Sequence, residues 1–481
     1  MLDINLFRTE KGGDPELIRE SQRRRFADVS LVDKVLELDV KWREARGNLD
    51  TLKMEFNKIV GEIKQIKIAK GDATELMEKS KAMKAGIKEA EENEKSVAEA
   101  LDAALLPIGN IVHDTVPISD DEANNAVVRE FGELRKPRDL EGGKKEKLWN
   151  HVDLVQLLDI AVLEKGTEVA GSRGYYLKNE GVLLNQALIN FAMQFGVTRG
   201  YSPMHTPFFM QKSIMAQCAQ LSQFDEELYK VTGEGEEKYL IATAEQTLCA
   251  LHRGEWFERN QLPIKYVGYS TCFRKEAGSH GRDTLGIFRV HQFEKVEQFC
   301  ITGPTDDESW KLLDELITNA EDFYKALEIP FHVVNIVSGE LNNAAAKKYD
   351  LEAWFPASAT FRELVSCSNC TDYQSRNLEI RLRSNQGAAA AEPAKKEYVH
   401  MLNSTLTATE RTLCCVLENY QCEDGVRIPK ALQPFMMGIE FIPFRKEYNA
   451  KGRLVDIEGA PKGVALGAQS NGAAAVSMST A

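Results

Sequence analysis

A long run of heptad spacing near the N-terminus constrains the fold of this chain more than any other feature. Mostly apolar residues follow one another there at alternating intervals of three and four: Val35, Leu38, Trp42, Ala45, Leu49, Leu52, Phe56, Ile59, Ile63 and Ile66. A seam of this kind, kept for more than four repeats, predicts a long helix packed along a partner helix.

A second seam supplies the partner helix. It runs from Leu76 to Leu101, with polar interruptions at Ser80 and Glu94, and it follows a turn-like sequence at residues 70–72. Because the connection is short, the two helices should lie antiparallel and form a coiled-coil hairpin over about residues 33–106. A helix of roughly 32 residues is about 48 Å long, so the hairpin should project beyond any globular domain beside it.

The end of this hairpin is basic, although the chain as a whole is acidic. The 481 residues carry a net charge of -13, whereas the segment from Lys58 to Lys88 contains eight lysines against four acidic residues. One interpretation is a solvated helical surface, since lysine is common at outward positions of coiled coils. The other is a surface that attracts the phosphates of RNA.

The composition indicates a soluble cytosolic protein of more than one domain. Hydrophobic residues make up 43% of the chain, and no apolar run reaches the roughly 18 to 20 residues needed to cross a bilayer, so no membrane partner is expected. The acidic N-terminal segment does not have the pattern of a secretory or transit peptide. Nine scattered cysteines, an odd number, fit reduced thiols, and we expect no disulfide.

Beyond the hairpin, the apolar pattern favours an α+β domain. Strand-like and helical segments alternate irregularly up to Phe444, which is typical of an antiparallel sheet flanked by helices. Neither a dinucleotide-type glycine fingerprint nor a phosphate-binding GxxxxGK[ST] loop occurs. Residues 384–396 have the composition of a loose surface insertion. The predicted division is an N-terminal domain at 1–115, a second domain at 116–445 and a disordered, Gly/Ala/Ser-rich tail at 446–481.

A predicted β-hairpin carries the residues that are best suited to ligand binding. Its strands are expected at 271–276 and 286–299, with a flexible loop at 277–284. It presents two arginines and two glutamates: Arg274, Arg289, Glu276 and Glu297. Arginine can bind phosphate with two parallel donors, and a buried glutamate can hold an ammonium or a hydroxyl group. The hairpin could therefore bind an anionic and a zwitterionic ligand together, and the structural alternative is a salt-bridged pair of strands.

Several segments, taken in order, resemble the motifs of class II aminoacyl-tRNA synthetases in the form found in seryl-tRNA synthetases. Phe273-Arg274-Lys275-Glu276, a loop, and Arg289-Val290-His291-Gln292-Phe293-Glu294-Lys295-Val296-Glu297 resemble motif 2. The other matching segments are the helix ending near Phe195 with the strand closing at Pro207 for motif 1, Asn403 to Arg411 with the following helix for motif 3, Thr243-Ala244-Glu245 for the serine-binding loop, and Phe361 to Cys370 for the strand before motif 3. The N-terminal hairpin is similar to the family's tRNA-binding arm, and the resemblance covers about residues 1–445.

The resemblance implies a class II synthetase fold and a reaction in two steps. ATP would activate L-serine as seryl-adenylate, and serine would then pass to the 3′-terminal ribose of tRNA(Ser). Arg274 would bridge the α-phosphate and the serine carboxylate, and Arg411 would clamp the γ-phosphate, so these two are the predicted catalytic residues. Further contacts to ATP are implied for Lys275, Glu276, Val290, Phe293, Glu363, Leu364, Val365 and Ser366. Among these, Glu363 and Ser366 would contact Mg²⁺ bound with ATP.

The resemblance also implies a serine pocket and two macromolecular contacts. The serine-binding residues would be Thr243, Ala244, Glu245, Arg274, Glu297 and Thr405. A site with buried partners for a hydroxyl group can reject alanine by up to roughly 10⁴ to 10⁵. The tRNA would be contacted by Lys64, Lys67, Lys81 and Lys84 on the hairpin. A homodimer would form through the motif 1 region, and the enzyme would be cytoplasmic.

Other interpretations remain open. Cys367-x-x-Cys370 could mark zinc, but the sequence offers no second ligand pair at a suitable spacing, and no structural zinc is expected. His291 could be a base, but an ionised carboxylate needs none, so a packing or hydrogen-bonding role is favoured. The chain could also be a non-catalytic RNA-binding or scaffold relative, or a ligase for another small amino acid. The presence of Arg274, Glu297 and Arg411 favours a catalytic enzyme.

Overall fold

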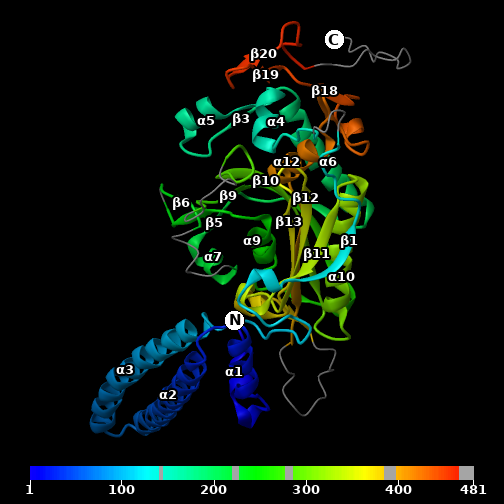
Figure 1. The fold of residues 1–481 in the computed structure, drawn as a ribbon. Helices are drawn as coiled ribbons and strands as arrows, with labels where there is room; N and C mark the ends of the chain where they lie inside the picture. Colours follow the sequence, from blue (N-terminus) through cyan, green and yellow to red (C-terminus); the bar gives the residue numbers. More distant parts are fainter. Residues whose placement is uncertain (140–144, 219–226, 234, 277–284, 384–396, 465–481) are drawn as a thin grey trace. The chain divides into compact units, whose positions relative to one another are not determined.

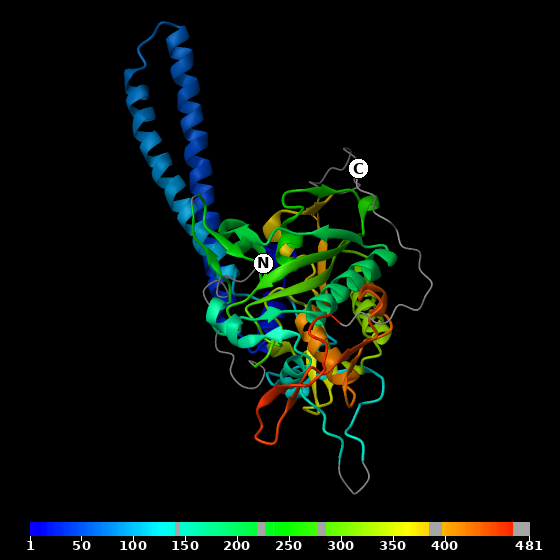
Figure 2. The same cartoon turned by 90° about the horizontal axis from the view of Figure 1, so that it is seen from above.

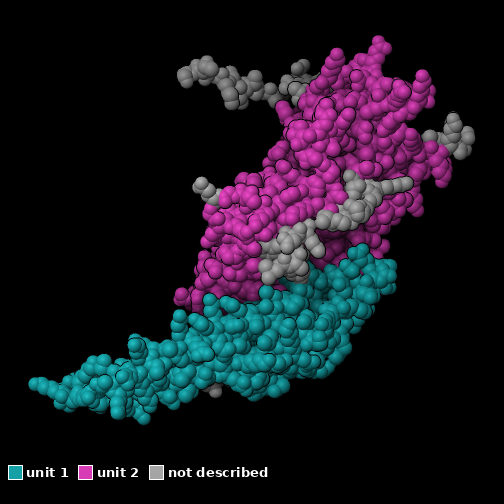
Figure 3. All heavy atoms as spheres, turned by 90° about the vertical axis from the view of Figure 1, so that its left-hand side faces the viewer, with its two compact units in different colours: residues 1–124, 337–346 teal, residues 125–336, 347–481 magenta. Residues whose placement is uncertain are grey.

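The computed structural model describes residues 1–139, 145–218, 227–233, 235–276, 285–383 and 397–464. The chain divides into two compact units, one formed by residues 1–124 and 337–346 and the other by 125–336 and 347–481 (Figure 3). The first unit extends past the predicted boundary at residue 115 because segment 116–124 pairs with 337–346. Ser338 N donates to Pro117 O, and Gly339 N donates to Ser119 O, both at 2.9 Å.

Two long helices make up most of the first unit, as the heptad pattern predicted. They are α2 (Ser30–Ile68) and α3 (Thr74–Leu105), and they lie side by side in both views (Figures 1 and 2). The 39 residues of α2 correspond to a length of about 58 Å. Polar Glu94 fits into the seam because its Oε1 accepts a hydrogen bond from Trp42 Nε1 at 3.2 Å. Between the helices, Lys70 adopts a left-handed conformation (φ 54°) and Asp72 accepts from Thr74 N at 2.9 Å.

The base of the hairpin is fastened by buried polar contacts within the same unit. The remaining elements of this unit are η1 (Ile4–Phe7), η2 (Thr9–Lys11), α1 (Pro15–Arg24), η3 (Glu122–Asn124) and η7 (Ser338–Glu340). Asp14 caps α1 and Pro15 occupies its first position, which suits a helix start. Arg25 is only 7% exposed, and its Nε donates to Asn110 O at 2.9 Å. Arg8 also forms an ion pair with buried Asp39 on α2.

An eight-stranded sheet forms the centre of the second unit. Its strands are β1 (Ala126–Phe131), β4 (Ser202–His205), β9 (Ile264–Phe273), β10 (Gln292–Thr302), β11 (Phe331–Asn335), β12 (Lys347–Phe355), β13 (Thr360–Asn369) and β16 (His400–Ala408). Their order across the sheet is β1-β11-β12-β13-β16-β10-β9-β4. All neighbours are antiparallel except β4 and β9, which run parallel. The predicted antiparallel sheet flanked by helices is therefore confirmed.

Helices and smaller sheets surround this central sheet. The helices are α4 (His151–Leu157), α5 (Leu163–Ala170), α6 (Glu180–Thr198), α7 (Lys212–Cys218), α9 (Ala244–Ala250), α10 (Glu308–Ala326), α11 (Tyr373–Leu378) and α12 (Thr409–Tyr420), with η5 (Arg259–Gln261) and η8 (Gln433–Phe435). The short strands are β2 (Ala161–Val162), β3 (Tyr176–Leu177), β5 (Phe209–Gln211), β6 (Lys230–Val231), β7 (Lys238–Leu240), β8 (Trp256–Phe257), β14 (Arg381–Leu382), β15 (Glu397–Tyr398), β17 (Gly425–Arg427), β18 (Phe441–Pro443), β19 (Lys446–Tyr448) and β20 (Leu454–Asp456). None of the helices in the described residues is long and apolar enough to cross a membrane.

The two faces of β10 pack into different clusters, and this alternation positions the site. Val296 and Cys300 belong to the large cluster that includes residues of α6, α10 and α12. Phe299 and Ile301 face a second cluster with residues of α9 and α11. Because side chains alternate along a strand, Glu297 points to the same face as Phe299, toward the start of α9.

Two expectations about local structure were wrong in part. Residues 286–291 form a turn followed by irregular backbone rather than strand: Gly286 has φ 69°, and only at Gln292 does pairing with β9 begin. Their apolar alternation reflects burial of Ile287, Phe288 and Val290 in the core. In the tail, β19 and β20 form a short antiparallel pair, so residues 446–464 are structured. The loop 277–284, the insertion 384–396 and residues 465–481 lie outside the described residues.

Candidate active site

A cleft of about 480 Å³ opens in the second unit, at the ends of β9, β10, β13 and β16. The residues predicted from the sequence that line it are Arg274, Glu276, Val290, Phe293, Glu363, Leu364, Thr405 and Arg411. Arg289, a ligand-binding candidate of the predicted hairpin, also lines it, as do four residues that the sequence analysis did not assign to the site: Phe288, Lys295, Ala408 and Glu410. Segments from 274 to 411 thus meet in one place, and their cationic side chains make the cleft suitable for an anionic ligand.

Arg274 is held at the end of β9 by contacts to its backbone and side chain. Its N donates to His291 O, and His291 Nδ1 donates back to Arg274 O, both at 2.9 Å. The guanidinium carbon lies 5.3 Å from the centre of the Phe293 ring, and Nε donates to Ala242 O at 3.4 Å. His291 therefore has the hydrogen-bonding role that was favoured for it, and it presents Arg274 to the cleft.

Glu276 and Arg289 form an ion pair at the mouth of the same hairpin. Arg289 Nε lies 2.5 Å from Glu276 Oε2, and Arg173 Nη1 donates to Glu276 O at 3.4 Å. Glu276 itself has a left-handed backbone (φ 52°), which turns its side chain away from the strand direction. The ion pair fits the structural alternative of a salt-bridged pair of strands in part, but both of its residues also line the cleft.

Arg411 and Glu363 meet on the opposite side of the cleft. Arg411 Nη1 donates to Glu363 O at 3.2 Å and lies 3.5 Å from Glu363 Oε2, while the guanidinium carbon is 5.2 Å from the Phe288 ring centre. The Glu363 side chain keeps 46% of its surface exposed to the cleft. Burial acts to raise the pKa of Glu363, but the positive charges of Arg411 and Lys348 outweigh it and the pKa is lowered. An ionised, accessible carboxylate of this kind suits Mg²⁺.

A buried carboxylate cluster lies beside the cleft, where β10 faces α9. Glu297 is 2% exposed and accepts from Thr243 Oγ1 at 2.8 Å and from Thr405 Oγ1 at 3.5 Å. Lys295, which is 9% exposed, forms an ion pair with the same carboxylate. The sequence did not identify Lys295 as a site residue, although its place two residues before Glu297 puts both side chains on one face of the strand.

Glu245, in the first turn of α9, is the second carboxylate of this cluster. Its Oε1 accepts from Gln374 Nε2 at 3.1 Å. Burial and the negative charge of Glu297 raise the pKa of Glu245, so a cationic ligand between the two carboxylates would stabilise the ionised form. Thr243 caps α9 through its side chain, and Ala244 is fully buried. Two glutamates and two threonines are therefore gathered where β10 faces the start of α9, and of these four residues only Thr405 lines the cleft.

Three of the predicted ATP-binding residues do not line the cleft with their side chains. Val365 is fully buried in the core, so it can contact a nucleotide only through its backbone. Ser366 is paired with Asp350 across β12 and β13, and burial raises the pKa of Asp350 to about 7. Lys275 N donates to Glu227 O at 2.9 Å.

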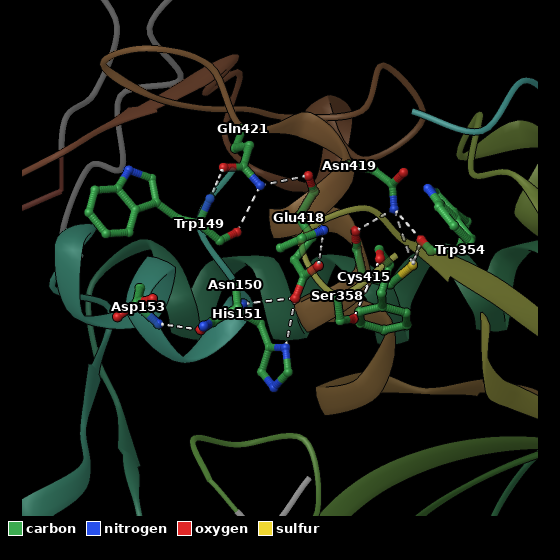
Figure 4. A network of polar contacts seen from close by, with 12 residues as sticks. Trp149, Asn150, His151, Asp153, Trp354, Ser358, Cys415, Glu418, Asn419 and Gln421 are labelled. Carbon is green, nitrogen blue, oxygen red and sulfur yellow. Dashed lines mark hydrogen bonds and ion pairs between the residues drawn. The ribbon is translucent and has the colours of Figure 1, made fainter. Parts of the chain in front are cut away.

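A buried polar network links α12 with the start of α4 (Figure 4). His151 Nδ1 and its backbone N both donate to Glu418 Oε1 at 2.9 Å, and Glu418 Oε2 accepts from Ala357 N at 3.1 Å. The His151 ring lies 5.5 Å from that of Phe288. Gln421 exchanges two hydrogen bonds with the backbone of Trp149. The network joins α12 to α4 and so fixes the helix that carries Arg411 at its other end.

The candidate metal ligands differ in their surroundings. Glu363 and Ser366 lie three residues apart on β13, with Glu363 open to the cleft. Cys367 and Cys370 are both buried, and Cys370 Sγ accepts from Asn403 Nδ2 at 3.7 Å. The described residues contain no group of three or more His, Cys, Asp or Glu side chains arranged to hold a metal ion.

The four lysines predicted to contact RNA lie on the hairpin of the first unit, near its turn. Lys64 and Lys67 belong to the last turns of α2, and Lys81 and Lys84 to the first half of α3. All four are exposed. Lys84 Nζ lies 5.9 Å from the centre of the Phe56 ring. Within the described hairpin, none of the four forms an ion pair, so their charges are available to a partner.

Comparison with known proteins extends these observations. Residues 1–112 match the family model described as seryl-tRNA synthetase N-terminal domain, and residues 229–420 match the tRNA synthetase class II core domain (G, H, P, S and T). The chain is 59% identical over 459 residues to the cytoplasmic serine–tRNA ligase of Arabidopsis thaliana, covering 95% of this chain and 99% of the relative. It is 54% identical over 449 residues to the cytoplasmic serine–tRNA ligase of Schizosaccharomyces pombe, covering 93% and 97%.

Solved structures show the same similarity in three dimensions. The crystal structure of cytoplasmic serine–tRNA ligase from Naegleria fowleri in complex with AMP is 55% identical, with a TM-score of 0.81 over 92% of this chain and 99% of that chain. Seryl-tRNA synthetase from Pyrococcus horikoshii, complexed with ATP, is 41% identical, with a TM-score of 0.80 over 92% of this chain and 100% of that chain.

Proposed function

Because the chain belongs to the seryl-tRNA synthetase family, we propose that its cleft binds ATP next to a serine pocket formed by Glu245, Glu297 and Thr405. The chain is an enzyme, a class II serine–tRNA ligase. It activates L-serine with ATP to seryl-adenylate and pyrophosphate and then transfers serine to the 3′-terminal ribose of tRNA(Ser). Its relatives from Arabidopsis thaliana and Schizosaccharomyces pombe are named cytoplasmic, and we assign this chain to the same compartment.

The observation that carries the proposal is the meeting of Arg274 with Arg411 across one cleft, beside a buried carboxylate cluster. Arg274 would hold the serine carboxylate near the α-phosphate, where its charge stabilises the developing negative charge during in-line attack. The nucleophile is already ionised, so the residues of the cleft need not remove a proton. Arg411 would bind the γ-phosphate and thereby orient the pyrophosphate for departure.

The nucleotide base would lie between the motif 2 residues. Phe293 would stack on the adenine ring, and the ion pair with Arg289 fixes the Glu276 carboxylate, which would accept from the adenine amino group. Lys275, Val290, Leu364 and Val365 would contribute contacts along the nucleotide, the last through its backbone. Mg²⁺ bound with ATP would neutralise phosphate charge, and of its two predicted ligands, Glu363 and Ser366, Glu363 is the one whose side chain lines the cleft and would hold it.

Selectivity for serine would follow from buried hydrogen-bonding partners. Glu245 would bind the amino group, while Glu297, with Thr405 and Thr243 beside it, would bind the side-chain hydroxyl. An amino acid without that hydroxyl would leave the buried Glu297 carboxylate without one of its partners. Ala244 would close the pocket as part of the buried start of α9.

Two contacts to macromolecules complete the proposal. Lys64, Lys67, Lys81 and Lys84 would bind the phosphates of tRNA(Ser), since they are exposed and unpaired in the described hairpin. A homodimer would form through the motif 1 region, α6 and β4, with β5 following it in the chain. Val182 and Val197 of α6 and Phe209 of β5 are 42%, 47% and 50% exposed, which supports a covered surface in solution.

ATP–pyrophosphate exchange without tRNA tests the proposal directly. Purified protein is assayed with each amino acid in turn, alongside Glu297→Gln. Exchange with serine that is strongly reduced in Glu297→Gln would support both the adenylate chemistry and the pocket. Absence of exchange with every amino acid would favour the non-catalytic scaffold, and exchange with a different amino acid would overturn the roles of Glu297 and Thr405. Sedimentation analysis of the same sample tests the dimer.

A further inference from the structure

The two buried carboxylates beside the cleft have different partners. Glu297, on β10, forms an ion pair with Lys295, which lines the cleft. Glu245, on α9, instead accepts a hydrogen bond from the neutral side-chain amide of Gln374 at 3.1 Å. Among the described residues, no cation forms an ion pair with Glu245. One carboxylate is therefore compensated by a positive charge, and the other is not.

The contacts of Glu297 leave one of its two oxygens without a partner. Thr243 Oγ1, Thr405 Oγ1 and Lys295 Nζ all contact Oε1. Within the described part of the chain, Oε2 has no hydrogen-bond partner. Because Lys295 already supplies the positive charge, Oε2 is better suited to accept from a neutral hydroxyl group than to bind a second cation.

The surroundings of Glu245 have the opposite character. Gln374 is 3% exposed and donates from Nε2, while its own Oε1 is buried and has no hydrogen-bond partner among the residues that the structure describes. Burial and the negative charge of Glu297 raise the pKa of Glu245, and the positive charge of Lys295 acts against that rise. An ammonium group would supply both the charge that Glu245 lacks and a donor for the amide oxygen.

This difference decides which way round a zwitterionic amino acid with a side-chain hydroxyl can bind. Without a cation on Glu297, both buried carboxylates would attract the one ammonium group, because pairing with it offsets the cost of burying either charge. The ion pair with Lys295 removes that competition. The ammonium group is then left to Glu245, and the hydroxyl group to Glu297.

We propose that Lys295 determines amino acid specificity through Glu297: by pairing with this carboxylate, it selects a hydroxyl side chain and rejects a second ammonium group. The inference rests on the proposed serine site. Lys295 is assigned no contact with serine, so it is a positioning residue. A merely structural ion pair predicts an equal loss of activity for every amino acid, and a contact with phosphate predicts a loss of ATP affinity.

The test compares L-serine with β-amino-L-alanine, which carries an ammonium group in place of the serine hydroxyl. Both are assayed by ATP–pyrophosphate exchange without tRNA, and the measured quantity is the ratio of their kcat/KM values. Lys295→Met keeps most of the side-chain length and removes the charge. We expect the preference for serine to fall by roughly 10- to 100-fold, with the KM for ATP within about twofold of the wild type. Lys295→Arg keeps the charge and should keep the preference.

A double variant keeps the test valid if Lys295→Met is too unstable to assay. Lys295→Met/Glu297→Gln removes both charges of the ion pair, so no unpaired ion remains in the core. The new amide can still accept from a hydroxyl group, but it does not attract an ammonium group. This variant should therefore prefer serine, and a preference for β-amino-L-alanine would overturn the inference.

Lys265 provides a matched control, because it forms an ion pair with Glu315 at 2.7 Å and does not line the cleft. Lys265→Met should keep the wild-type preference. The inference is overturned if Lys295→Met loses activity with both amino acids by the same factor, if the loss lies in the KM for ATP, or if the control loses its preference as well. A wild type that exchanges with serine and an unchanged preference in Lys295→Met would overturn the inference alone. Wild-type protein that exchanges with no amino acid would instead overturn the proposed function.

Discussion

Neutralising the four exposed lysines near the hairpin turn should separate tRNA recognition from serine activation. The variant replaces Lys64, Lys67, Lys81 and Lys84 with alanine. All four are exposed, and none is paired in the described part of the hairpin, so their removal should change the free energy of unfolding by less than about 0.5 kcal/mol. The catalytic cleft is formed entirely by residues 274–411, so its chemistry should not change.

The size of the effect on tRNA follows from counterion release. If each lysine contacts one phosphate, the slope of log affinity against log salt should become shallower by about 3 to 4. Between about 50 and 200 mM salt, the wild type should then lose roughly 100-fold more affinity for tRNA than the variant loses.

The assay compares the KM for tRNA in aminoacylation, over this salt range, with ATP–pyrophosphate exchange. A control variant replaces four other exposed lysines of the same unit, Lys11, Lys34, Lys41 and Lys95, and so carries the same change in charge away from the turn. We expect the control to keep most of the salt dependence of the wild type. An equal loss of exchange and charging in the first variant, or an unchanged salt slope, would refute the division of labour between hairpin and cleft.

Further outcomes concern the cleft and the cysteines. Arg411→Lys should raise the KM for ATP by roughly 10- to 100-fold in the exchange assay, because lysine cannot present two parallel donors, and an unchanged KM would exclude the γ-phosphate role. Glu297→Gln should raise the KM for serine. It should also lower the free energy of unfolding by about 3 kcal/mol in urea unfolding, because it leaves the buried Lys295 charge unpaired. If the stability falls and the KM for serine does not change, Glu297 has only a structural role. In the native protein, a thiol-reactive dye should label at most the two partly exposed cysteines, Cys218 and Cys422. After denaturation without reductant, it should label all nine cysteines, and fewer than nine labelled cysteines would reveal a disulfide.

Periodicity in the sequence predicted secondary structure correctly where a helix packs mainly against the next helix in the chain. The two heptad seams predicted α2 and α3. The polar residue Glu94 of the second seam accepts a hydrogen bond from Trp42 on the facing helix. The same reasoning misplaced the start of β10 because alternation of apolar residues has two causes. Phe288 and Val290 alternate because they are buried under the cleft, not because they are paired in a strand.

The tail shows a second limit of composition. Its Gly, Ala and Ser content predicted disorder from residue 446, yet β19 and β20 pair immediately after Arg445. Arg445 is 4% exposed and binds Glu180 through two contacts of 2.7 and 2.8 Å. Glu180 lies 265 positions away in the chain, so the composition of the tail cannot indicate that this contact holds its start in place.

The sequence by itself determined the helical hairpin, the α+β class of the second unit and most residue types of the cleft, because periodicity and motif spacing are properties of neighbouring residues. Only the tertiary structure decided which side chains meet. It placed Lys295 against Glu297, Arg411 over Phe288, and the Glu410 carboxylate against the backbone N of Glu294. These contacts depend on the register of β10 with β16 and on the point where α12 begins. Register and helix packing are set by the whole core, and a one-residue shift in the pairing of β10 would turn Lys295 and Glu297 to the other face of that strand.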